Sequence, residues 1–138
     1  MIVSDGPAHY SIVMAKDQST KMIAIVDDDE SVQNALQDLI EADGLKARCF
    51  GSAEEFLESG LQRKAACLIT DIRMPGMSGL ELQARLKADG CRIPIIFITA
   101  HGDTRVRIQA MREGAVEFLM KPFDDQVFLS RVRAAVHS

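Results

Sequence analysis

Five side chains that are suited to phosphate or metal chemistry stand at the ends of apolar, strand-like runs. Asp27 and Asp28 follow MIAIV, and Asp71 follows ACLIT. Thr99 ends IPIIFIT, and Lys121 follows EFLM. A carboxylate at the end of a buried run is costly unless something compensates its charge. The sequence therefore implies that each carboxylate meets a compensating group in the folded chain.

These residue types fit phosphoryl transfer to a carboxylate. Three carboxylates that lie together repel one another, and a divalent cation such as Mg²⁺ (or Mn²⁺) removes the conflict. Asp71 is then available as a nucleophile, because carboxylates attack phosphoryl groups to form aspartyl-phosphates. The metal and Lys121 would supply positive charge, and Thr99 a hydroxyl donor. Ala100, with only a methyl side chain, leaves room for the phosphoryl group.

The elements that must position these groups alternate along the chain. Strands are predicted at 22–26, 46–50, 66–70, 93–99 and 117–120. Between them, apolar residues at helical spacing predict helices over 32–40, over 52–60, around Leu82 and Leu86, and from about 103 to 113. A last helix carries Phe128, Val132, Ala135 and Val136 on one face. The pattern comprises five strand–helix pairs.

This alternation predicts the α/β fold class. Parallel strands joined by right-handed crossovers place helices on both faces of one sheet. We expect a flavodoxin-like doubly wound five-stranded parallel sheet of order 2-1-3-4-5, with five helices. Ligands of such sheets bind beyond the carboxyl ends of the strands, where the strand order reverses. That edge would hold the three aspartates, the threonine and the lysine.

Each of these residues also has an ordinary explanation when it is taken alone. The run from Asp27 to Asp29 is able to cap the following helix. Asp71 is able to serve as a turn residue before Met-Pro-Gly. Thr99 at a strand end is also explained as a structural residue. Lys121 and Pro122 are also explained as the entry to the next helix, with the proline ending the strand. Their joint placement at the ends of the correct strands favours the phosphoryl-transfer interpretation.

Composition sets the wider limits. The 138 residues fit one domain, and a net charge of −4 argues against a large nucleic-acid surface. No run approaches the roughly 18 apolar residues of a membrane span, and the N-terminus lacks a secretory pattern, so we expect a cytoplasmic protein. The three cysteines are too widely spaced for a zinc site or a disulfide framework. Residues 1–21 are expected to form a flexible extension, and residues 22–138 the domain.

Four segments carry a family resemblance. IVDDDE, TDIRMPGMSG, FITAHGD and EFLMKPF resemble, in order, the motif blocks of the receiver domain of two-component response regulators. The last three are particularly similar to the nitrogen-fixation transcriptional regulator subgroup, whose members often join a receiver to a helix-turn-helix domain. The resemblance runs from about Met22 to the C-terminus. It implies a phosphoprotein of phosphorelay signal transduction that is linked to transcription.

The resemblance also implies a role for each matching residue. Asp71 would be the phosphoacceptor. Asp28, Asp71 and the backbone carbonyl of Arg73 would hold the metal, with Asp27 as the indirect member of the acidic pair. Thr99, Ala100 and Lys121 would contact the phosphoryl oxygens. Thr99 and Phe118 would form the switch. Arg73 and His101 would tune the lifetime of the phosphoryl group. His101 is equally well explained as a surface loop residue. The bond between Lys121 and Pro122 is expected to be cis.

The implied function is that of a switch. A sensor histidine kinase or a phosphotransfer protein would phosphorylate Asp71, and the phosphoryl group would bias a two-state equilibrium. The fourth helix, fifth strand and fifth helix would then control a homodimer, an output domain or a partner. Arg105, Arg107 and Arg112 make the fourth helix unusually basic, which indicates either a solvated face or an altered partner surface. The domain would catalyse only its own phosphorylation and dephosphorylation, and would contact neither membrane nor nucleic acid directly.

Two other function classes are distinguishable from this one. A flavin-binding module of the same topology needs a phosphate loop rich in Ser, Thr and Gly after the first strand, where this sequence has three aspartates. A degenerate receiver that serves only as a binding platform would not need Asp28, Asp71, Thr99 and Lys121, and their presence argues against this class. The chain is either a stand-alone receiver or part of a longer regulator.

Overall fold

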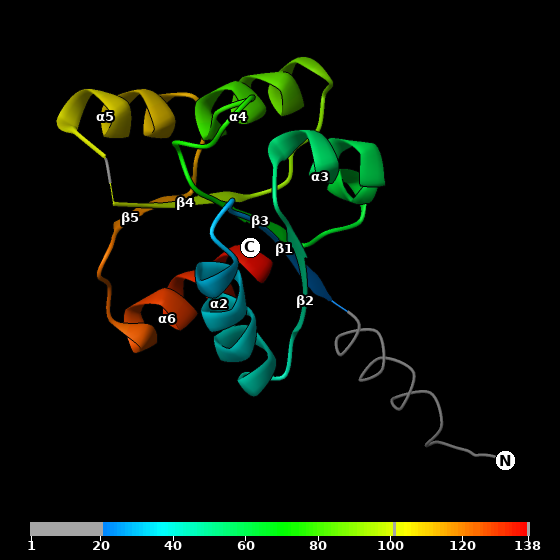
Figure 1. The fold of residues 1–138 in the computed structure, drawn as a ribbon, viewed down its shortest axis with the longest axis vertical. Coiled ribbons are helices and arrows are strands. Elements are labelled where there is room, and N and C mark those ends of the chain that lie inside the picture. Colours follow the sequence, from blue (N-terminus) through cyan, green and yellow to red (C-terminus); the bar gives the residue numbers. More distant parts are fainter. Residues whose placement is uncertain (1–20, 101, 138) are drawn as a thin grey trace, which may run out of the picture.

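The fold is a five-stranded parallel sheet in the order β2-β1-β3-β4-β5, as the sequence predicts (Figure 1). The structure is a computed structural model and describes residues 21–100 and 102–137. The strands are β1 (Met22–Val26), β2 (Lys46–Phe50), β3 (Cys67–Thr70), β4 (Ile95–Thr99) and β5 (Glu117–Met120). The predicted N-terminal extension lies, apart from Lys21, outside the described residues.

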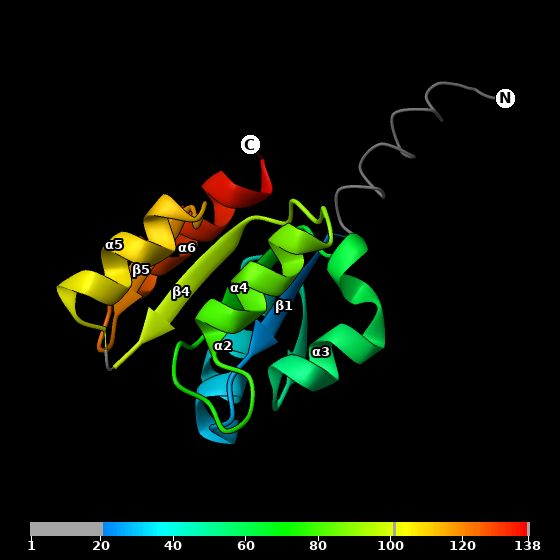
Figure 2. The ribbon, with the colours of Figure 1, turned by 90° about the horizontal axis from the view of Figure 1, so that it is seen from above.

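Helices cover both faces of the sheet. They are α2 (Glu30–Ala42), α3 (Ala53–Ser59), α4 (Gly79–Ala88), α5 (Thr104–Arg112) and α6 (Asp125–Val136), with a short 3-10 helix at Leu61–Arg63 that the sequence pattern did not indicate. Figures 1 and 2 show α2 and α6 on one face and α3, α4 and α5 on the other. No helix of the described residues is long and apolar enough to cross a membrane.

Burial explains why the central strands read as continuous apolar runs. Every residue of β3 and β4 is buried, because helices pack on both sides of these strands. The edge strand β2 is less completely covered, and its residues range from exposed to buried. Both central strands begin later than predicted, at Cys67 and Ile95. At β4 the reason is Pro94, which has no N–H to donate to the ladder, although its carbonyl accepts a hydrogen bond from the Leu68 N–H at 2.8 Å.

Side chains cap the start of every α-helix that the structure describes. The caps are Asp29 on α2, Ser52 on α3, Ser78 on α4, Asp103 on α5 and Asp124 on α6. Each accepts a hydrogen bond from a backbone N–H that has no partner within its helix. The three cysteines are free thiols, and burial raises the pKa of Cys67 to about 12. Cys67 is part of the hydrophobic core, and Cys49 and Cys91 are partly buried against it.

An ion pair joins the C-terminal end of α2 to α6. The Arg133 guanidinium donates from Nη2 to Asp43 Oδ1 at 2.6 Å and from Nε to Oδ2 at 2.8 Å. The hydrogen bonds from Arg133 lower the pKa of Asp43 below its usual value of 3.8. A carboxyl whose pKa is lower in the folded chain stabilises the fold above its unfolded pKa, and this contribution disappears as the pH falls through the folded value.

We therefore predict that Asp43→Asn lowers the melting temperature at pH 7 by about 1–4 °C, since the pair is partly exposed to solvent. The difference from wild type should shrink below pH 3.8, as the wild-type carboxyl becomes protonated. Thermal unfolding by circular dichroism over this pH range measures both effects. Asp38→Asn is the matched control, because Asp38 is exposed on the same helix and makes no ion pair with the described residues. An equal loss in both variants would contradict the prediction.

Candidate functional site

Backbone hydrogen bonds just beyond the strand ends fix the positions of three predicted site residues. The Asp71 N–H donates to the Val26 carbonyl at 3.2 Å, and the Lys121 N–H donates to the Thr99 carbonyl at 3.0 Å. The Asp27 N–H donates to the carbonyl of Phe50, on the other side of β1, at 3.1 Å. The ladder thus continues one residue past each strand. Asp27, Asp71 and Lys121 are therefore set by the sheet itself and not by mobile loops.

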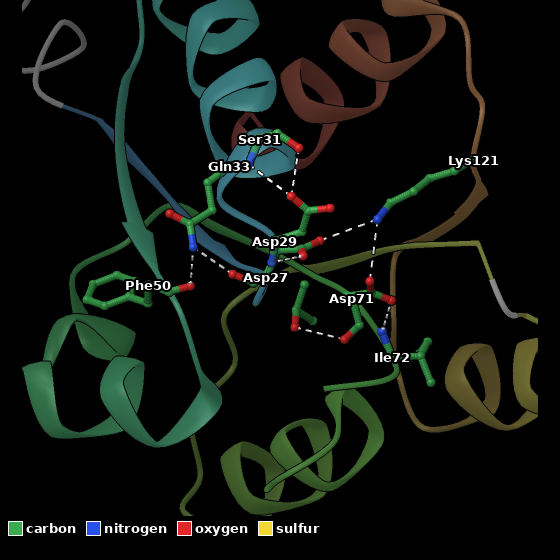
Figure 3. Close-up of polar contacts among 9 residues, drawn as sticks. Asp27, Asp29, Ser31, Gln33, Phe50, Asp71, Ile72 and Lys121 are labelled. Carbon is green, nitrogen blue, oxygen red and sulfur yellow. Dashed lines mark hydrogen bonds and ion pairs between the residues drawn. The ribbon is translucent and has the colours of Figure 1, made fainter. Parts of the chain in front are cut away.

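A single ammonium group links two buried carboxylates at this edge. Lys121 Nζ lies 3.4 Å from Asp27 Oδ2 and 3.4 Å from Asp71 Oδ2 (Figure 3). Asp27 is only 3% exposed and Asp71 only 8%. Burial raises the pKa of Asp27, and the negative charge of Asp71 raises it further, whereas the Asp29 N–H and Lys121 lower it. Lys121 therefore offsets part of a charge conflict that the fold creates.

The three consecutive aspartates have three different environments. Asp27 Oδ1 accepts a hydrogen bond from the Asp29 N–H at 2.9 Å, and Asp29 Oδ1 accepts one from the Ser31 N–H at the start of α2. Asp28 is exposed and contributes to the wall of the pocket. The helix-capping explanation thus applies to Asp29, while Asp27 and Asp28 are left for the site.

Gln33 supports the acidic segment, and the sequence pattern did not single it out. Its Nε2 donates to the Asp27 carbonyl at 2.7 Å and lies 3.5 Å from the Phe50 carbonyl (Figure 3). This side chain therefore ties the first turn of α2 to the ends of β1 and β2. In the sequence, the only sign of this role is that Gln33 is a polar residue on the sheet-facing side of an amphipathic helix. The sequence does not show which carbonyls it contacts, because they belong to the ends of β1 and β2.

The carboxylate of Asp71 is held from two sides. Oδ1 accepts a hydrogen bond from the Ile72 N–H at 2.6 Å, while Oδ2 faces Lys121. The Asp71 carbonyl accepts a hydrogen bond from Thr70 Oγ1 at 3.0 Å. Gly79 packs on the same backbone, and a Cβ there would lie 2.1 Å from the Asp71 carbonyl oxygen. The side chain and the backbone of Asp71 are both fixed.

Thr99 and Phe118 lie behind the site. Thr99 is fully buried at the end of β4, and Phe118 is 5% exposed on the neighbouring strand β5. The rings of Phe118 and Phe97 have centroids 6.3 Å apart. Gly102 faces the Phe118 ring closely, since a Cβ at Gly102 would lie 2.6 Å from Cζ. The loop after β4 is thus in direct contact with the ring.

An open pocket brings most of the predicted residues together. Its lining consists of Asp27, Asp28, Asp29, Val32, Asp71, Arg73, Ala100 and Lys121. Thr99 and Phe118 are not part of this lining, and His101 lies outside the described residues. The peptide bond between Lys121 and Pro122 is cis.

The pocket suits a hard cation better than a soft one. Its potential side-chain ligands are all carboxylates, and Arg73, whose backbone carbonyl is the third expected ligand, is among the lining residues. Within residues 21–100 and 102–137, no three His, Cys, Asp or Glu side chains are arranged to hold a metal by themselves. Mg²⁺ does not require such a cage, because it usually keeps several waters and binds one or two carboxylates together with phosphate oxygens. The residues present therefore fit Mg²⁺.

Comparisons with known proteins agree with this geometry. Residues 23–133 match the response regulator receiver domain. Nodulation protein W of Bradyrhizobium diazoefficiens is 48% identical over 118 residues, which cover 85% of this chain and 52% of that protein. Response regulator protein TodT of Pseudomonas putida F1 is 46% identical over 115 residues, which cover 83% of this chain and 51% of that protein.

A solved structure shows the same likeness. The crystal structure of FixJ-N superposes with a TM-score of 0.76 at 38% identity, and the match covers 85% of this chain and 94% of that one. This chain spans about half the length of the curated relatives that it matches. The chain belongs to the receiver domain family of response regulators, and its relatives include regulators of the nitrogen-fixation type.

Proposed function

We propose that this chain is a phosphorylation-operated switch in which Asp71 accepts a phosphoryl group from a sensor histidine kinase or a phosphotransfer protein. The observation that carries the proposal is the position of Lys121 Nζ, 3.4 Å from one carboxylate oxygen of Asp71 and 3.4 Å from one of Asp27, in an open pocket. A cation at this point is able to stabilise charge that develops on a phosphoryl group during transfer.

The roles of the pocket residues follow from their environments. A carboxylate oxygen of Asp71 would attack the phosphorus, and the bond from phosphorus to the donor's leaving group would break. Asp28, Asp71 and the Arg73 carbonyl would hold Mg²⁺, with Asp27 behind them. The bound ion would supply positive charge to the phosphoryl oxygens. Lys121 would supply the second positive charge, and Ala100 leaves space.

Phosphorylation would disturb the charge balance around Lys121. The new phosphoryl oxygens would compete with Asp27 for the ammonium group and attract a hydroxyl donor from Thr99. Thr99 is buried at the end of β4, and Phe118 is buried on the adjacent strand. A shift of Thr99 would therefore alter the packing around the Phe118 ring. Residues Arg73 and His101 would tune the lifetime of the phosphoryl group.

The face formed by α5, β5 and α6 is the proposed output surface. Large hydrophobic side chains are exposed on this face or next to it. Among the described residues, the exposed large hydrophobic side chains are Ile108, Met111, Val116, Met120 and Val127. On α5 the exposed Arg105, Arg107 and Arg112 border this apolar group, and α6 begins with exposed Asp124 and Asp125. A face with one basic and one acidic border suits pairing with a second copy across a two-fold axis.

The control of transcription belongs to the same proposal. The relatives are about twice as long as this chain, and one of them is named transcriptional regulatory protein FixJ. We propose that the output face regulates dimerisation, an output domain or a separate partner in a transcription-linked pathway. The domain itself would turn over no external substrate.

The second prediction concerns the phosphoacceptor. After incubation with acetyl phosphate and Mg²⁺, the wild-type chain should gain the mass of one phosphoryl group, and Asp71→Asn should gain none. Lys121→Met should slow the reaction on the order of a hundredfold, since it removes a preorganised positive charge. Intact-protein mass spectrometry over time measures both, with Asp38→Asn as a control of unchanged rate. A phosphoryl mass that survives Asp71→Asn contradicts the assignment, and none on wild type favours the binding-platform class.

The third prediction concerns the proposed output face. With beryllofluoride and Mg²⁺ as a phosphoryl mimic, the wild-type chain should dimerise, and Met111→Glu should remain monomeric because it places a charge in the apolar group. Light scattering after size-exclusion chromatography gives the mass of each species. Ala35→Glu, which adds the same charge to an exposed position of α2, should still dimerise. If both variants dimerise like wild type, the interface lies elsewhere.

A further inference from the structure

A side chain from another element holds the loop that follows Asp71. This loop, residues 72–78, connects β3 to α4 and contains Arg73. The Met77 N–H donates to Glu54 Oε2 at 3.0 Å. Glu54 lies in the first turn of α3, 23 residues earlier in the chain. The contact thus joins two segments that the sheet does not connect directly.

The loop is shaped to receive this carboxylate. Gly76 has a φ of +78°, and a Cβ there would lie 2.7 Å from Glu54 Oε2. A side chain at position 76 would therefore be strained by the backbone and would also collide with the carboxylate oxygen. Gly76 makes room for Glu54, and Gly79 makes room for the Asp71 backbone.

Both ends of the loop are fixed by local contacts, whereas its middle depends on Glu54. At one end, the Ile72 carbonyl accepts a hydrogen bond from the Gly79 N–H at 2.8 Å. At the other, Ser78 and Glu81 form a reciprocal capping box at the start of α4. Between these points, Met74 is buried in the core. Among the described residues, Glu54 is the only one whose side chain makes a hydrogen bond with the backbone of residues 73–77, and it does so as an acceptor.

We propose that Glu54 is a positioning residue for the phosphorylation pocket. Its carboxylate would hold residues 73–77 in the arrangement that presents the Arg73 carbonyl to Mg²⁺. This inference rests on the function proposed above, because it assumes that the pocket binds the ion. Residues that orient metal ligands usually change metal affinity by about 10- to 100-fold when they are replaced.

The next residue provides a matched control. Glu55 also lies in the first turn of α3, but its Oε1 accepts a hydrogen bond from the Gly51 N–H at 2.8 Å and does not contact the loop. An acidic residue in a first turn has a general explanation, since it interacts favourably with the helix dipole. If charge alone mattered, Glu54 and Glu55 would be equivalent. Their different partners separate loop positioning from the dipole effect.

Two conservative substitutions separate reach from charge. Glu54→Gln keeps the side-chain length and an acceptor oxygen but removes the charge. Glu54→Asp keeps the charge but is one methylene shorter, so that it does not reach the Met77 N–H. Loop positioning predicts that Gln preserves Mg²⁺ binding and that Asp impairs it. The dipole explanation predicts the opposite order.

The experiment is a Mg²⁺ titration followed by amide signals in ¹⁵N NMR spectra. We expect Glu54→Asp and Glu54→Ala to raise the dissociation constant for Mg²⁺ about tenfold, and to shift the Met77 amide signal before any Mg²⁺ is added. Glu54→Gln and Glu55→Ala should stay within about threefold of wild type. In the acetyl phosphate reaction, the weakened variants should need more Mg²⁺ for the same maximal rate.

The possible outcomes discriminate between the two proposals. Wild-type affinity in Glu54→Asp and Glu54→Ala, or failure of the wild-type chain to bind Mg²⁺ at all, overturns the inference about Glu54. A wild-type chain that binds Mg²⁺ with the expected order of variants, but that never acquires a phosphoryl group, overturns the proposed function and leaves the positioning role intact.

Discussion

The site depends on one electrostatic constraint, which is the burial of two carboxylates within reach of a single ammonium group. Asp27 and Asp71 are almost inaccessible to solvent, and Lys121 Nζ is 3.4 Å from each. One positive charge does not neutralise two negative ones, so the pocket keeps an excess of negative charge next to an open cavity. Such an arrangement is expensive for stability alone. It is consistent with the proposed binding of a cation and an incoming phosphoryl group.

The sheet is what makes this constraint durable. The ladder continues one residue past each strand end, so that the Asp27, Asp71 and Lys121 backbones are held by neighbouring strands. Buried strands are covered on both faces, and their side chains have little freedom to move apart. The loops at the same edge are fixed differently. They rely on individual side chains such as Gln33 and Glu54, whose partners belong to other elements.

The same edge connects the pocket to the proposed output face. Lys121 follows β5 directly, and the Phe118 ring lies on β5 against Phe97 and Gly102. The exposed apolar group on α5, β5 and α6 therefore begins a few residues from the pocket. A change in the position of Thr99 or Lys121 has a short path to that surface, through packed side chains and the loop after β4. This proximity is a property of the strand order.

The sequence by itself determined the strand order and most of the residues that line the pocket, although it did not indicate that Asp29 and Val32 line it as well. Strands and helices are recognised from the spacing of apolar residues within short segments of the sequence. Once the strands are known to be parallel, their carboxyl ends must lie together at one edge of the sheet. Only the tertiary structure decided how the three aspartates divide their roles, with Asp29 as the cap of α2. It also decided that Glu54 holds the loop after Asp71 and that Gly76 and Gly79 serve packing. These features depend on contacts between residues that are distant in the chain, and such contacts leave no periodic pattern in a single sequence.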